Sequence, residues 1–73
     1  MLRDIDRAVE LLKPLLTGLA EDRDKTIDVY ADVYNGKSHI VVTVNNAKYE
    51  INVTAENVRS MIKSVIDVVA LKL

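Results

Sequence analysis

The sequence predicts an α+β domain with the element order α-β-β-β-α, in which a three-stranded antiparallel meander packs two helices on one face. Apolar and polar residues alternate over 26–34 and 38–45, on either side of Asn35-Gly36. That dipeptide favours the type I′ turn of a tight hairpin, because both central residues need positive φ. Helical periodicity precedes and follows these strands, so we expect one domain, 1–73.

Residues 2–20 are predicted to form an amphipathic helix. Its inward stripe recurs every three or four residues and consists of Leu2, Ile5, Val9, Leu12, Leu15, Leu16 and Leu19. Pro14 removes the backbone bond to the Glu10 carbonyl and crowds that turn, so we expect a kink or break between these residues. Leu11 lies off the stripe and is a candidate contact with another chain. The charged residues 21–25 are expected to form a loop.

The Asn-Gly turn also predicts the register of the first hairpin, because a two-residue turn pairs Tyr34 with Lys37. The inward pairs are then Ile27 with Val44, Val29 with Val42, and Ala31 with Ile40. On the other face, the same register sets Tyr30 opposite Val41 and Asp32 opposite His39. After a second turn near Asn45-Asn46, residues 48–53 form the third strand.

A second helix is expected from Thr54 onward. Thr54 is a suitable N-cap, and Val53 and Val58 stand at the positions of a hydrophobic staple. The predicted inward side chains are Val58, Met61, Ile62, Val65, Val69 and Leu73. A final strand is the alternative near the C-terminus, where β-branched residues are frequent, but no turn residue separates it from the helix.

Composition limits the ways in which this small chain can be stabilised. With 73 residues and no cysteine, it has neither disulfides nor a thiolate zinc site. Hydrophobic residues make up 49% of the chain, which favours oligomerisation as the additional source of stability. The net charge of −1 argues against binding to anionic membranes, and no signal peptide is visible, so we expect a cytoplasmic protein.

The sequence offers no convincing catalytic or metal site. Asp32 and His39 are the only acid–imidazole pair that the register brings together, and no nucleophile or glycine-rich loop accompanies them. The carboxylates of Asp28, Asp32 and Glu50 stand on strands and do not converge as a calcium site requires. We therefore expect no enzymatic activity, no metal and no cofactor.

Two surfaces are candidates for protein binding. The first lies on the outer sheet face, where tyrosines are typical of interfaces, although they also favour strands; it comprises Tyr30, Tyr34, His39 and Val41. The second is a predicted homodimer interface, because the last helix is apolar around most of its circumference. Its residues are Leu11, Leu15, Ile66, Val69, Leu71 and Leu73. Edge-to-edge pairing of strands is the alternative route to a dimer.

Nucleic-acid binding is the competing functional hypothesis, and it would use Lys37, Arg59 and Lys63. Double-stranded-RNA-binding domains share the element order, but here the Asn-Gly turn that joins the first two strands is too short to reach a groove of the RNA. Two or three cations neutralise few phosphates. The sequence therefore favours a small non-enzymatic regulator that binds an unidentified protein as a homodimer, similar in its physical features to inhibitors encoded by phages and plasmids.

Overall fold

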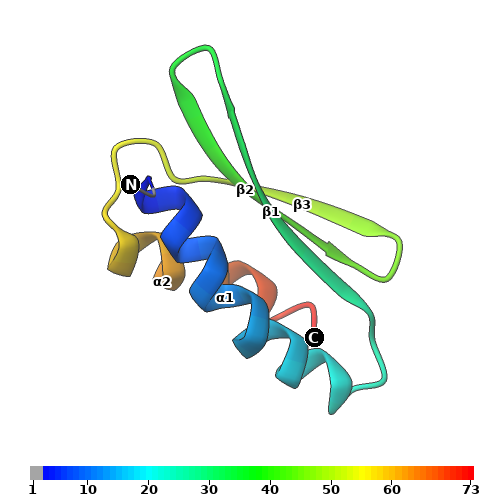
Figure 1. The fold of residues 1–73 in the computed structure, drawn as a ribbon. Helices are drawn as coiled ribbons and strands as arrows, with labels where there is room; N and C mark the ends of the chain where they lie inside the picture. Colours follow the sequence, from blue (N-terminus) through cyan, green and yellow to red (C-terminus); the bar gives the residue numbers. More distant parts are fainter. Residues whose placement is uncertain (1–2) are drawn as a thin grey trace.

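The computed structural model describes residues 3–73 and confirms the α-β-β-β-α order. Its elements are α1 Asp4–Glu21, β1 Ile27–Tyr34, β2 Lys37–Val44, β3 Ala47–Asn52 and α2 Val58–Val69. The three strands form one antiparallel sheet in the order β1-β2-β3, and both helices cover the same face of it (Figure 1). The predicted helix start at Leu2 lies outside the described residues.

The register derived from the Asn-Gly turn is confirmed. Asn35 and Gly36 have φ angles of 51° and 72°, as a type I′ turn requires. Tyr34 pairs with Lys37, and Val29 pairs with Val42. Because successive strand residues point to opposite faces, this pairing assigns every side chain of the hairpin to the helix-covered face or to the open face.

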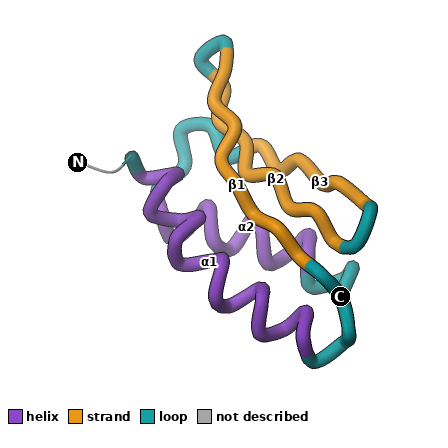
Figure 2. The backbone as a smooth tube through the Cα atoms, turned by 45° about the vertical axis from the view of Figure 1, so that its right-hand side comes forward, coloured by secondary structure: helices purple, strands orange, loops and turns teal. Residues whose placement is uncertain are grey.

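The core lies between the helix-covered face of the sheet and the two helices, which run in the same general direction (Figure 2). Its buried side chains are Ile5, Ala8, Val9, Leu12 and Leu16 of α1, Val29, Ile40, Val42, Val44, Ile51 and Val53 of the sheet region, and Met61, Val65 and Val69 of α2. Leu15 and Leu19, which were expected to face inward, are exposed. Small residues such as Ala8 and Ala20 are buried, so the packed face of α1 is rotated away from Leu15 and Leu19.

The expected break at Pro14 is wrong, because α1 continues through it from Asp4 to Glu21. Pro14 is exposed, so water can hydrogen-bond to the Glu10 carbonyl that its missing N–H leaves free. Leu12 and Leu16 are buried on either side of the proline and hold both halves of the helix on the sheet.

The predicted start of the second helix is also wrong. Asn57 is the N-cap of α2, and its side chain accepts a hydrogen bond from the Ser60 backbone N–H at 2.8 Å. The Thr54 hydroxyl instead accepts the Ser38 backbone N–H at 2.9 Å, while the Val53 N–H donates to the Ser38 carbonyl. Residues 53 and 54 therefore extend the pairing with β2, which delays the helix by three residues.

The end of α2 is stabilised by cations from the loop between α1 and β1. The helix stops at Val69, and residues 70–72 form a turn. Lys25 Nζ donates to the Lys72 carbonyl at 2.9 Å, and Arg23 reaches the Leu73 carbonyl at 3.5 Å. Positive charge near a helix C-terminus interacts favourably with the helix dipole. Within residues 3–73, neither helix is long and apolar enough to cross a membrane.

We expect Asn57→Ala to lower the free energy of unfolding by about 1 kcal/mol, because the Ser60 N–H loses its side-chain acceptor. Asn57→Asp should retain most of the stability, since a carboxylate also caps the helix. Urea denaturation followed by circular dichroism measures both variants. Equal stabilities of the alanine variant and the unchanged protein would show that this cap contributes little.

Candidate functional site

The open face of the sheet carries the predicted protein-binding residues. Strand alternation places Tyr30, Tyr34, His39 and Val41 together there, opposite the face that the helices cover. The β1–β2 hairpin extends beyond both helices, with the Asn35-Gly36 turn at its far end (Figure 1). Residues near this end are therefore accessible from both faces of the hairpin.

Tyr34 and His39 form a stacked pair at the projecting end of the hairpin. Their ring centroids lie 5.4 Å apart, and the ring planes differ by 12°. The two residues are diagonal cross-strand neighbours, since His39 is two positions beyond Lys37, the partner of Tyr34. Tyr34 is 47% exposed, so much of this aromatic pair remains available for contact.

Val41 was predicted to be a surface contact residue, but it is buried, with an exposed fraction of 0%. It is on the central strand, flanked by Tyr30 of β1 and Glu50 of β3. The Tyr30 side chain, followed by the Glu50 carboxylate, raises the pKa of Lys48 on β3. Tyr30 and Val41 stand directly opposite each other on the open face, so the tyrosine is the cross-strand neighbour of the buried valine.

The Asp32–His39 pair lacks the geometry of an acid–base site. The residues are opposite each other in the register, but within residues 3–73 no hydrogen bond or ion pair joins them. His39 Nδ1 is buried without a hydrogen-bond partner in the same part of the chain. The described residues also contain no group of three or more acidic or histidine side chains that could hold a metal.

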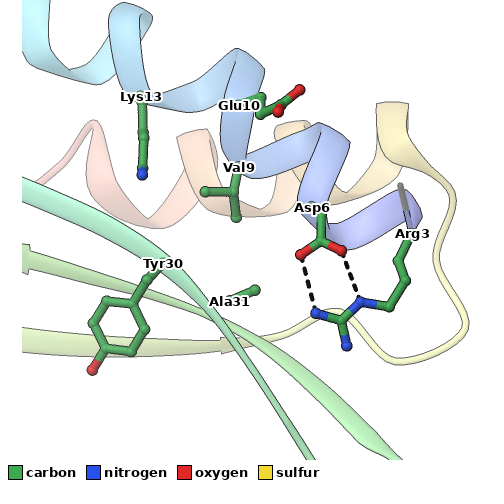
Figure 3. Close-up of a pocket in the computed structure, with 7 residues that line it drawn as sticks. All are labelled: Arg3, Asp6, Val9, Glu10, Lys13, Tyr30 and Ala31. Carbon is green, nitrogen blue, oxygen red and sulfur yellow. Dashed lines mark hydrogen bonds and ion pairs between the residues drawn. The ribbon is translucent and has the colours of Figure 1, made fainter. Parts of the chain in front are cut away.

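A groove between α1 and the edge strand β1 is a feature that the sequence did not reveal. It has a volume of about 380 Å³ and is lined by Arg3, Asp6, Val9, Glu10, Lys13, Tyr30 and Ala31 (Figure 3). Arg3 forms two hydrogen bonds to the Asp6 carboxylate, at 2.8 and 3.0 Å. This contact lowers the pKa of Asp6 and raises that of Arg3. The groove depends on how α1 crosses the sheet, which no local pattern encodes.

Some residues of the predicted dimer interface lie at the surface, and others are partly or fully buried in the chain's own core. Leu11 and Leu71 are 54% and 86% exposed, and Leu15 is also exposed, whereas Ile66 and Leu73 are half-buried. Val69 is fully buried in the chain's own core, so it is not available at this surface. Leu19, which was not predicted for the interface, lines a 120 Å³ hollow with Arg23, Ala70 and Leu73. This hollow therefore lies where the C-terminal ends of α1 and α2 come together.

The residues of the nucleic-acid hypothesis are not brought together. Lys37 lies at the end of the hairpin, whereas Arg59 and Lys63 lie on α2 at a distance from it (Figure 1). Lys63 is already paired, because its Nζ lies 2.9 Å from Asp67 Oδ2, and that contact raises its pKa. The helix therefore does not present a continuous basic stripe.

Comparison with protein-family models, with curated proteins and with solved structures found no match for this chain.

A double-mutant cycle with Tyr34→Ala and His39→Ala should give a coupling free energy of about 0.5–1 kcal/mol, because the two rings are stacked. A matched cycle with Tyr49→Ala and His39→Ala should give almost none, since Tyr49 lies on the helix-covered face. Chemical denaturation measures all the variants. Equal couplings in the two cycles would contradict a specific contribution from the stack.

Proposed function

We propose that this chain is a cytoplasmic, non-enzymatic protein-binding regulator that acts as a homodimer. Its contact surface with the partner is the hairpin patch, defined as Tyr30, Tyr34 and His39 with Val41 beneath them. The observation that carries this proposal is the Tyr34–His39 stack at the projecting end of the hairpin, in which the tyrosine is 47% exposed. The non-enzymatic part is supported by the residues around His39, among which no base–nucleophile arrangement is found within residues 3–73.

The hairpin patch is suited to binding because its aromatic side chains are held in place before a partner arrives. Tyr34 is stacked on His39, and Tyr30 is directly opposite the buried Val41 in the strand register. Tyrosine also supplies a large contact area for few rotatable bonds. Side chains that are already ordered lose less conformational entropy on association, which favours affinity.

An interface of typical area would be larger than the hairpin patch, which would form its centre. A standard interface covers about 800 Å² on each partner. That area is roughly one sixth of this chain's 4770 Å². Such an interface would extend from the tyrosines to neighbouring residues of β1, including Val33, which is 43% exposed at the end of the strand.

Self-association is supported by the leucine surface, defined as Leu11, Leu15 and Leu19 of α1 together with Leu71 in the turn that follows α2. All four side chains are exposed, and the first three recur at intervals of four residues along α1. A second copy that covered them would add buried apolar area to a core that is small for an independent domain.

Replacing both tyrosines of the hairpin patch, Tyr30→Ser with Tyr34→Ser, should reduce capture of the partner at least tenfold, because the aromatic contact area is lost. Quantitative mass spectrometry of proteins retained from lysate of the native host measures this effect. Val68→Ser is the matched control, since it removes an exposed apolar side chain from α2. An unchanged set of retained proteins with the double variant would contradict the proposal.

The homodimer is tested by sedimentation equilibrium at micromolar concentration, where we expect twice the mass of one chain. Leu11→Glu with Leu15→Glu should give a single-chain mass, because burial of two carboxylates in the interface is costly. Val33→Glu, at the hairpin end, is the control and should remain dimeric. A single-chain mass for the unchanged protein would rule out the dimer.

A further inference from the structure

The free edge of β1 presents backbone groups that no other strand uses. In an antiparallel pair, residues whose N–H and C=O bond to the neighbour alternate with residues whose groups point away. The Asn45 N–H donates to the Thr26 carbonyl at 2.8 Å, so even-numbered residues of β1 bond to β2. Val29, Ala31 and Val33 therefore direct their N–H and C=O groups to the outer edge of the sheet.

Part of this edge is already occupied by a neighbouring side chain. The Val29 N–H donates to Asp28 Oδ1 at 3.0 Å. Within residues 3–73, neither the N–H of Ala31 nor that of Val33 donates to a side chain. The open stretch is thus residues 31–33, and Ala31 also lines the groove beside α1.

The helix-covered side of this edge favours apolar side chains on an added strand. Ala31 and Val9 contribute the apolar part of the groove, which α1 also lines with Arg3, Asp6, Glu10 and Lys13, and Val33 is exposed two residues further along β1. A side chain that is opposite Ala31 or Val33 in a neighbouring strand points to the same face as they do. It would therefore cover Val33 or enter the groove.

The open-face side of the edge favours basic side chains. Asp28 and Asp32 flank Tyr30 along β1, and the strand contains no basic residue. Within residues 3–73, neither carboxylate takes part in an ion pair. Opposite charges on adjacent strands attract, and a lysine or arginine can also contact the exposed face of the Tyr30 ring.

We propose that the β1 edge binds an extended segment of the partner protein in which basic and apolar residues alternate, so that the segment adds a fourth strand to the sheet. The inference rests on the proposed function, and it specifies how the partner meets the hairpin patch. The basic side chains lie beside Asp28, Tyr30 and Asp32, while the apolar ones face Val33 and the groove.

Two competing arrangements fit the charges less well. A second copy paired through β1 would bring the same two aspartates to the edge and no basic residue. The other edge strand, β3, carries both signs of charge on its open face, where Lys48 Nζ lies 3.5 Å from Glu50 Oε1. Charged side chains of this kind discourage strand addition, so β1 is the favoured edge.

The test uses the full chain and a nine-residue capped peptide of alternating lysine and valine. We expect saturable binding in NMR titrations, with amide exchange of Ala31 and Val33 slowed at least tenfold at saturation. A glutamate–valine peptide, and a peptide with the same lysines and valines in two blocks, should bind at least tenfold more weakly. Equal binding of all three peptides would overturn the proposal.

Backbone methylation of the peptide separates strand addition from simple charge attraction. Only alternate amides of an added strand point toward β1, those of the valines in an antiparallel arrangement. N-methylation of the set whose amides point toward β1 should therefore abolish binding, and N-methylation of the other set should be tolerated. In an antiparallel arrangement the sensitive set is the valines, and in a parallel arrangement it is the lysines. An equal effect of both sets would contradict strand addition, because the two peptides have the same sequence and the same charge.

Charge is tested on the protein by Asp28→Asn with Asp32→Asn, which should weaken peptide binding at least tenfold. The matched control is Asp22→Asn with Asp24→Asn, which removes the same charge from the preceding loop. Equal weakening by the two double variants would overturn the assigned contacts.

Failure of strand addition can be told apart from failure of the proposed function. If removal of the tyrosines abolishes partner capture but the peptide does not bind, the proposed function stands and strand addition is rejected. Concentration-dependent protection of Ala31 and Val33 without peptide would assign the edge to a second copy.

Discussion

The two-residue turn at Asn35-Gly36 is the constraint on which the rest of the molecule depends. Positive φ angles at both residues align the twist of the turn with that of the strands, so the pairing of Tyr34 with Lys37 propagates along the hairpin. A shift of one residue would move every inward valine and isoleucine to the open face. The same turn thus determines which side chains form the core and which meet across the open face.

The number of strands determines the arrangement of the helices. Three antiparallel strands leave the chain at the end of the sheet opposite to the one where β1 began, so α2 runs back along the sheet in the same general direction as α1 (Figure 2). The two C-terminal ends then lie together, and Lys25 and Arg23 reach the last carbonyls of the chain. Because both helices lie on the same face of the sheet, the open face and the β1 edge are uncovered. The proposed contacts with a partner therefore all lie on β1 and the adjoining open face.

Much of the candidate site could be predicted from the sequence, because strand register is a local property. Alternation and turn chemistry correctly placed Tyr30, Tyr34, His39 and Val41 on one face. They could not predict that Val41 would be fully buried, since burial depends on the conformations of side chains on all three strands. The groove was missed for a similar reason: Ala31 and Val9 meet only through the position of α1 on the sheet.

The sequence by itself determined the α+β class, the strand pairs and the face to which each strand residue points. Tertiary structure decided which side of each helix is covered, because an apolar stripe can be wider than the surface on which it packs. It buried Val69 and left Leu15 and Leu19 exposed. It also moved the N-cap from Thr54 to Asn57, because the Thr54 hydroxyl bonds to Ser38 on β2. Those outcomes depend on contacts between residues distant in the sequence, and a period or a capping preference describes only near neighbours.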